Sequence, residues 1–156
     1  MKNIAIIGAG WYGCHIGVEL KKNNYNVEIF ERNSICFCEA SGKNQNRLHA
    51  GFHYARNYTT RMQTVDGYEQ FMRRYKFLTK EVASNLYLVP EYDSLLDFKT
   101  YCTIMNAAGA KMEQVDVPEY LSGIAGAIRT EERVILTDAA REYFSLNLKD
   151  NINYNS

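Results

Sequence analysis

The sequence predicts an α/β fold that begins with a parallel βαβ unit. Residues 2–7 are a short β-branched run that ends at glycine, residues 11–22 show the spacing of a helix, and residues 27–30 form a second apolar run. The first and last runs are typical of buried strands, because each is short, apolar and closed by a turn signal. The three segments fit into about thirty residues, which is the size of one βαβ unit with parallel strands.

The helix of this unit is defined at both ends. It follows a glycine-rich turn, and Lys21 and Lys22 in its last turn complement the helix dipole before two asparagines end it. Residues 33–58 carry little regular pattern and are rich in Asn, Ser, Gly, His and Tyr, as functional loops are. Further elements are predicted as follows: helices over 60–80, 94–108 and 138–148, strands over 86–89, 126–128 and 134–136, and an extended segment over 115–120.

Composition excludes several classes of function. The 18 basic and 18 acidic residues balance, so no net field draws the chain to nucleic acid. No apolar run approaches the ~20 residues that cross a bilayer, and residues 4–7 are too short for a signal peptide. We therefore expect a cytoplasmic protein without nucleic-acid or membrane partners, whose four cysteines are thiols. The pair Cys36 and Cys38 has no second pair at ligand spacing, so we expect no metal site.

A glycine motif lies between the first strand and the helix. It fits the pattern G-x-G-x-x-G and consists of Gly8, Ala9, Gly10, Trp11, Tyr12 and Gly13. Gly8 permits a tight turn, Gly10 lets a pyrophosphate approach the backbone, and Gly13 lets the helix lie close to the strands. The phosphates would face the N-terminus of the helix, with its N–H groups and partial positive charge. This position predicts a dinucleotide site, and a turn that binds nothing is the alternative.

An acidic residue completes this pattern. Glu31 ends the second strand, where a carboxylate accepts hydrogen bonds from the adenosine ribose and disfavours a 2′-phosphate. Arg32 follows, and its positive charge weakens the discrimination against a 2′-phosphate. Both residues are therefore expected in the cofactor site.

Two stretches resemble a known family. Gly17 extends the glycine motif to G-x-G-x-x-G-x-x-x-G, and residues 6–32 closely resemble the N-terminus of FAD-dependent oxidoreductases. Residues 40–54, ASGKNQNRLHAGFHY, resemble the second motif of the D-amino-acid oxidase-like superfamily, and are most similar to its 2-hydroxyglutarate oxidase branch. The resemblance implies a Rossmann-type flavoprotein that binds FAD and moves a hydride from a small-molecule 2-hydroxy acid or amine to flavin.

The same resemblance implies roles for single residues. Ser41 and Gly42 are expected at the phosphates, and the residues expected near the flavin or the substrate are Asn44, Asn46, His49, Ala50 and Gly51. His49 and His53 are the candidate catalytic residues, because an imidazole can orient or deprotonate a hydroxyl or amine. A packed histidine in a polar loop is the alternative for His49. Arg47 is a candidate for pairing with a substrate carboxylate, although loop arginines are more often solvated.

The resemblance also implies domains. Residues 1–80 are expected to hold the FAD-binding βαβ unit with its flavin-proximal loop and helix. Residues 81–150 are expected to begin an α+β substrate domain, and residues 151–156 to form a disordered tail. Family members are more than twice as long, so we expect an N-terminal portion, inactive alone, whose sheet a missing C-terminal part or a second chain completes.

Three alternatives stay open. A non-catalytic nucleotide-binding module would use the same glycine motif. A sugar-nucleotide mutase of the UDP-galactopyranose type also binds FAD, but residues 40–54 lack the Gly-Gly pair expected there. An NAD dehydrogenase shares the three glycines, yet has no use for residues 41–54.

Overall fold

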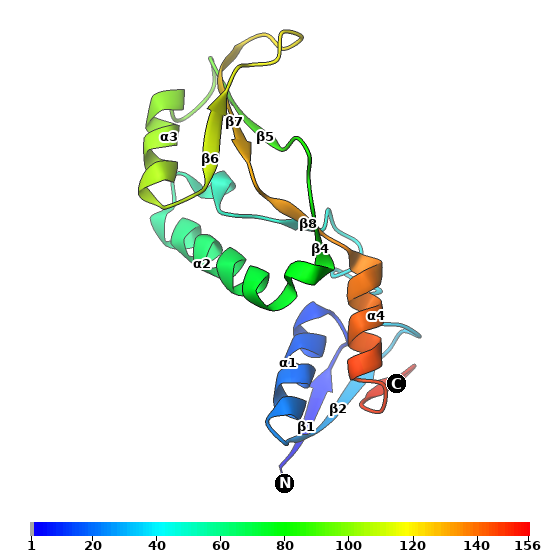
Figure 1. The fold of residues 1–156 in the computed structure, drawn as a ribbon. Helices are drawn as coiled ribbons and strands as arrows, with labels where there is room; N and C mark the ends of the chain where they lie inside the picture. Colours follow the sequence, from blue (N-terminus) through cyan, green and yellow to red (C-terminus); the bar gives the residue numbers. More distant parts are fainter. Residues whose placement is uncertain (1) are drawn as a thin grey trace. The chain divides into compact units, whose positions relative to one another are not determined.

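The computed structural model describes residues 2–156, which divide into two compact units. Unit 1 consists of Met1–Asn46 and Ile135–Ser156, and unit 2 consists of Arg47–Val134. Figure 1 shows the chain leaving unit 1 after strand β2 and returning to it through β8 and helix α4.

This division differs from the boundary expected near residue 80. Residues 47–80 belong to unit 2 because their apolar side chains pack there. Phe52 and Ala55 share one buried cluster with Val89, Met105 and Ile128.

Unit 1 is built on a parallel three-stranded sheet with the strand order β1-β2-β9. The bounds of its elements are β1 Asn3–Ile7, α1 Trp11–Lys22, β2 Asn26–Glu31, α4 Thr137–Asn147 and β9 Ile152–Tyr154. The predicted βαβ unit is present, and the α/β fold class is confirmed.

The third strand lies where the polar composition predicts a disordered tail. Ile152 of β9 pairs with Ile29 of β2. The amide of Ile29 donates to the carbonyl of Asn151 at 2.7 Å, and the side-chain amide of Asn151 donates to the carbonyl of Val27 at 3.0 Å. The open edge of β2 gives residues 151–154 backbone partners, so that segment is a strand despite its polar residues.

The sheet of unit 1 is buried on one face. Val27 and Ile29 of β2 are 1% and 0% exposed, and a Cβ added to Gly17 of α1 would lie 2.7 Å from the side chain of Ile29. Alternate residues of β1 remain exposed, including Ile7 at 84%. The short apolar run predicts a fully buried strand, but side chains alternate between faces and α1 covers only one of them.

An aromatic cluster forms the rest of the core of unit 1. Phe37 and Phe144 are 2% and 0% exposed, and their ring centroids are 5.7 Å apart. The ring of Trp11 stacks on Phe37 at 5.6 Å and meets the edge of Phe144 at 5.4 Å. The loop after β2, the start of α1 and helix α4 are thereby held together.

Unit 2 contains an antiparallel sheet ordered β5-β7-β6 and a second sheet ordered β3-β8-β4, in which β3 and β8 are antiparallel. The bounds of its elements are β3 Arg47–Leu48, η1 Phe52–Tyr54, α2 Tyr58–Tyr75, η2 Lys76–Leu78, β4 Thr79–Glu81, β5 Leu86–Pro90, α3 Phe98–Ala107, β6 Met112–Val115, β7 Ile124–Thr130 and β8 Arg133–Ile135. The strands predicted at 126–128 and 134–136 belong to β7 and β8, which lie in different sheets.

The two long helices of unit 2 begin at side-chain caps. Asn57 accepts a hydrogen bond from the amide of Thr60 at the start of α2, and Asp97 accepts one from the amide of Thr100 at the start of α3. These caps satisfy amides that have no partner within the helix, and they set where each helix begins.

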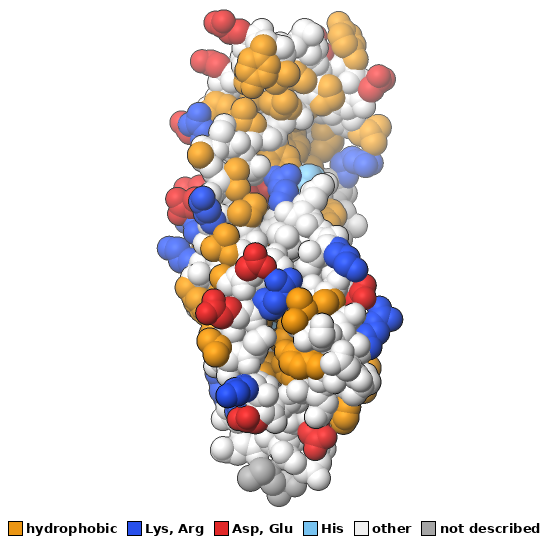
Figure 2. Space-filling model, turned by 90° about the vertical axis from the view of Figure 1, so that its right-hand side faces the viewer, with side chains coloured by type: hydrophobic (Ala, Val, Ile, Leu, Met, Phe, Trp, Pro, Cys, Tyr) orange, Lys and Arg blue, Asp and Glu red, His pale blue; other side chains and the backbone are white. Residues whose placement is uncertain are grey.

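The surface carries both signs of charge. On the face drawn in Figure 2, lysine and arginine side chains alternate with aspartate and glutamate, and neither sign gathers into a large patch. Among residues 2–156, no helix is both long enough and apolar enough to cross a bilayer.

Candidate nucleotide-binding site

The glycine turn of unit 1 has a backbone that side chains would obstruct. Gly8 has a φ of +95°, which favours glycine, and its amide donates to the carbonyl of Phe30 at 2.8 Å. A Cβ on Gly13 would overlap the carbonyl oxygen of Gly8, so α1 approaches the turn closely only because residue 13 is glycine. A Cβ on Gly10 would lie 3.1 Å from Oγ of Ser41. The turn is therefore tightly packed at Gly13 and Gly10, whereas a Cβ on Gly8 would meet no atom within 4 Å.

Glu31 is bound to this turn. Its carboxylate accepts a hydrogen bond from the amide of Ala9 at 2.7 Å, and its other oxygen accepts two from Asn33, at 2.8 Å and 2.7 Å. Burial alone would raise the pKa of Glu31, but the hydrogen bonds from Ala9 and Asn33 and the charge of Arg32 together hold it below its usual value. The carboxylate is thus charged and fixed beside the glycine turn.

Ser41 reaches the same place from the loop after β2. Its Oγ accepts a hydrogen bond from the amide of Trp11, the first residue of α1, at 2.9 Å. Gly42 follows in a tight turn, where a Cβ would overlap the carbonyl oxygen of Phe37. The structure therefore brings the glycine motif, Glu31 and Ser41 together at the N-terminus of α1, which favours anions.

The other predicted residues of unit 1 have different surroundings. The Trp11 ring lies in the aromatic cluster, and the side chain of Tyr12 is 82% exposed. Arg32 forms an ion pair with Glu39 at 3.0 Å. Asn44 donates to the carbonyl of Ala40 at 2.6 Å and accepts from the amide of Asn46 at 2.6 Å, so these asparagines shape the loop itself.

The predicted residues His49, Ala50, Gly51 and His53 belong to unit 2, where they surround a buried carboxylate. The side chain of Glu132 is 1% exposed. Its Oε1 accepts from the amide of Ala50 at 2.7 Å. Its Oε2 accepts from other groups: the guanidinium of Arg47 at 3.1 Å, the hydroxyl of Tyr87 at 2.7 Å and the amide of Asn85 at 3.3 Å.

The two histidines lie beside this carboxylate. His49 Nδ1 is 3.7 Å from Oε2 of Glu132, and His53 Nε2 is 3.2 Å from the hydroxyl of Tyr87. The two imidazole rings are 4.7 Å apart, edge to face. Gly51, with a φ of +95°, turns the backbone between them.

Burial controls the charges in this cluster. Desolvation lowers the pKa of His49, and the charges of His53 and Arg47 add to that effect, while Glu132 opposes it. Burial and the bond to Glu132 raise the pKa of Tyr87. At neutral pH His49 is therefore a neutral imidazole, which can accept a proton.

Sequence reasoning missed Glu132, Asn85 and Tyr87. The triplet Glu131-Glu132-Arg133 is typical of an exposed turn, and nothing in its pattern distinguishes the buried glutamate from its neighbour. Arg47 was a candidate for a substrate carboxylate, and in the structure it pairs with the carboxylate of Glu132.

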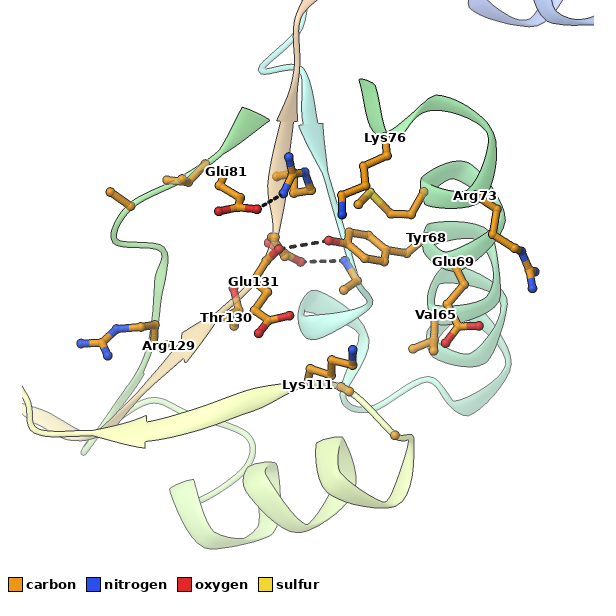
Figure 3. A pocket seen from close by; sticks show the side chains of 18 residues that line it. Val65, Tyr68, Glu69, Arg73, Lys76, Glu81, Lys111, Arg129, Thr130 and Glu131 are labelled. Atoms are coloured by element: carbon orange, nitrogen blue, oxygen red, sulfur yellow. Dashed lines mark hydrogen bonds and ion pairs between the residues drawn. The ribbon is translucent and has the colours of Figure 1, made fainter. Parts of the chain in front are cut away.

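Unit 2 also contains a cavity of about 730 Å³. Figure 3 shows Lys76 and Lys111 directed into it, and Arg129 directed away. One ion pair and a tyrosine contribute to its walls: Arg133 binds Glu81 at 2.6 Å, and the hydroxyl of Tyr68 donates to the carbonyl of Glu131 at 3.0 Å. Ala50 and Glu132 line it as well, so the buried carboxylate forms part of the cavity wall.

Comparison with known proteins places this geometry in a family. The family model described as "FAD dependent oxidoreductase" (DAO) matches residues 3–132. The chain belongs to this family.

Curated relatives in this FAD-dependent family are longer. The chain is 43% identical over 149 residues to the FAD-dependent monooxygenase FPY4 of Fusarium mangiferae. The matched region covers 94% of this chain and 40% of that protein. It is 37% identical over 92 residues to the FAD-dependent monooxygenase kojA of Aspergillus flavus. That matched region covers 59% of this chain and 22% of that protein. The chain thus spans about two fifths or less of the length of these relatives.

Solved structures share the fold. L-α-glycerophosphate oxidase from Mycoplasma pneumoniae, solved with FAD bound, matches with a TM-score of 0.73 and 16% identity, over 99% of this chain and 45% of that one. Glycine oxidase from Geobacillus kaustophilus matches with a TM-score of 0.69 and 18% identity, and the match covers 99% of this chain and 46% of that one. At these identities the likeness shows the fold alone. Placement in the 2-hydroxyglutarate oxidase branch stays a prediction.

FAD is the cofactor of the family, and unit 1 fits its ADP half. The N-terminus of α1 would offer donors to the pyrophosphate, and the charged Glu31 would offer an acceptor to the ribose.

Proposed function

We propose that unit 1 holds the ADP half of FAD in an oxidoreductase that takes a hydride from a 2-hydroxy acid or an amine. The observation that carries this proposal is the hydrogen bond between Glu31 and Ala9. It fixes an ionised carboxylate beside a glycine turn and a helix N-terminus, and these are the groups that an adenosine diphosphate requires.

Each part of unit 1 would make a different contact. The backbone of residues 8–13 would face the pyrophosphate, together with Ser41 and Gly42. Glu31 would accept hydrogen bonds from the ribose hydroxyls, because each carboxylate oxygen accepts more than one donor. Arg32 is the remaining candidate on this side, and its ion pair with Glu39 reduces the charge that it offers to a 2′-phosphate.

The catalytic part of the proposal concerns unit 2. FAD, when bound, supplies the hydride acceptor. His49 is a neutral imidazole and would accept the proton of the substrate hydroxyl or amine. His53, whose ring centroid lies 4.7 Å from that of His49, would assist as its neighbour.

Retention of flavin tests the proposal directly. We expect the purified chain, mixed with FAD and passed through gel filtration, to keep a visible flavin band. Glu31→Gln and Ser41→Ala should lose flavin, because each removes a contact at the N-terminus of α1. Glu28→Gln is the matched control, since Glu28 is exposed on the same strand.

The outcomes distinguish the alternatives. A wild-type chain that retains no flavin contradicts the proposal for these 156 residues. Retention of ADP or NAD in place of FAD would instead favour a nucleotide-binding module.

A second candidate is monooxygenation, which the 43% identity to a protein named as an FAD-dependent monooxygenase favours. The two reactions differ in where oxygen goes. With labelled dioxygen, a monooxygenase transfers label to the product, whereas an oxidase gives labelled hydrogen peroxide and an unlabelled product.

A further inference from the structure

Glu132 joins parts of unit 2 that are far apart in the sequence. Its carboxylate binds the side chain of Arg47 and the amide of Ala50 on either side of His49, and it also binds Tyr87 of β5. The backbone that carries His49 is therefore fixed from both ends by one buried anion. Such a charge is costly to bury unless donors surround it, and here four donors do.

The imidazole of His49 faces the same anion. Its Nδ1 is buried and has no hydrogen-bond partner within residues 2–156, and Oε2 of Glu132 lies 3.7 Å away. A neutral imidazole carries a proton on one ring nitrogen and a lone pair on the other. A lone pair on Nδ1 would point toward a negative charge where little water screens it, whereas an N–H there is attracted.

We propose that Glu132 is a positioning residue for His49, which holds the neutral imidazole with its proton on Nδ1 and its lone pair on Nε2. The inference rests on the proposed function in one respect, which is the use of that lone pair. The proton of the substrate O–H or N–H bond would pass to Nε2 while the hydride leaves the adjacent carbon for the flavin.

The groups that face His49 favour this state. Arg47 and His53 lie on the same segment, and Glu132 faces it from the junction of β7 and β8. Burial, the largest cause, and the charge of Arg47 keep the ring neutral, so the position of its single proton decides which nitrogen is basic.

His53 provides an internal contrast. The hydroxyl of Tyr87 donates its proton to Glu132, so its oxygen accepts from Nε2 of His53. We therefore infer the opposite tautomer for His53, with the proton on Nε2.

Nitrogen-15 NMR of the histidine rings tests the inference on the chain without flavin. The sequence has three histidines, so the variants His15→Gln and His53→Gln assign every ring signal. At a pH where the rings are neutral, we expect Nδ1 of His49 to be the protonated nitrogen and Nε2 to show the shift of an unprotonated one. Glu132→Gln should give a mixture of tautomers and lower the pKa of His49, because the attraction for the proton is removed.

The matched control is Glu131→Gln, which makes the same chemical change at the exposed neighbouring residue and should alter neither property. A wild-type His49 with its proton on Nε2 would overturn the inference, as would a Glu132→Gln variant with an unchanged tautomer and pKa. If Glu132→Gln does not fold, the wild-type tautomer still decides the matter. Because no flavin is needed, a failure to bind FAD and a failure of this inference are separate results.

Discussion

The carboxylate of Glu31 and the amide of Ala9 are joined by a 2.7 Å hydrogen bond across 22 residues of sequence. The bond connects the end of β2 to the turn that begins α1, so the residue expected to bind ribose also stabilises the turn expected to bind pyrophosphate. We therefore expect a single substitution at residue 31 to change both stability and binding.

The first prediction concerns pH. The pKa of Glu31 is held below its usual value of 4.5 in the folded chain. A carboxyl with a lowered pKa stabilises the fold fully above its unfolded pKa, and that contribution is lost as the pH falls through the folded pKa. We expect Glu31→Gln to lower the free energy of unfolding by about 1–3 kcal/mol at neutral pH. The difference from wild type should shrink below pH 4.5.

Denaturant unfolding at several pH values measures this difference. Glu28→Gln, on the same strand, leaves the bonds to Ala9 and Asn33 in place and should change stability little. A Glu31→Gln difference that stays constant into acid would contradict the prediction.

The second prediction compares two glycines. Gly13→Ala places a Cβ on the carbonyl oxygen of Gly8, so we expect a loss of stability of about 1–3 kcal/mol, with loss of flavin retention. Gly67→Ala makes the same change inside α2, where a Cβ would meet no atom within 4 Å. That variant should gain about 0.5–1 kcal/mol. Thermal and denaturant unfolding of both variants give the comparison, and equal effects would show that the packing argument is wrong.

The third prediction concerns Cys36. Its sulfur lies 4.0 Å from Sγ of Cys14, 3.0 Å from the hydroxyl of Tyr154 and 3.7 Å from that of Ser145. The hydrogen bond from Cys14, followed by those from Tyr154 and Ser145, lowers the pKa of Cys36 below its ordinary value, against burial and the charge of Glu31. We expect the ultraviolet absorbance of a thiolate to appear with a midpoint below the ordinary thiol pKa of 9.0.

Three variants isolate this signal. Cys36→Ser should abolish the transition, and Tyr154→Phe should move it to higher pH because one donor is lost. Cys102→Ser should leave it unchanged, since burial raises the pKa of Cys102. A wild-type chain that forms thiolate only near the ordinary thiol pKa of 9.0 would refute the prediction.

The fourth prediction concerns the aromatic cluster of unit 1. Phe144 is fully buried against Trp11 and Phe37, so Phe144→Ala should cost about 3–5 kcal/mol. Leu146→Ala is the matched control in the same helix, because Leu146 is 69% exposed. The fluorescence of Trp11, the single tryptophan, reports unfolding of this unit. Similar losses for the two variants would argue against a core built on this cluster.

The sequence predicts the elements that depend on neighbouring residues. The order of strand, glycine turn, helix and strand over residues 2–31 follows from apolar spacing and from glycines whose geometry a side chain would block, as at Gly13. The predicted proximity of Ser41 to the start of α1 came from the family resemblance, and the bond from the Trp11 amide to Ser41 gives it a physical basis.

Contacts between residues far apart in the sequence cannot be predicted from such local signals. β9 is polar, and it is a strand because it pairs with the open edge of β2. In the sequence the two strands are separated by the whole of unit 2. Glu132 and the exposed Glu131 have nearly the same neighbours in the sequence, so the local sequence does not distinguish them. Only the fold brings Arg47, Tyr87 and the Ala50 amide to Glu132. The division into two units differs from the boundary expected near residue 80, because burial of Phe52 against Ile128 leaves no local pattern in the sequence.

The hydrogen bond from the Ile135 amide to the Asn46 carbonyl, at 2.7 Å, ties together the two points where unit 2 is inserted into unit 1. β1, α1 and β2 are synthesised before unit 2, and β9 cannot join them until all of residues 47–134 have been made. If those residues fold first, the loop that closes when β9 pairs is shortened in effect, and its entropic cost falls. The order of translation thus places completion of the β1-β2-β9 sheet after the synthesis of unit 2, which can fold before that sheet is complete.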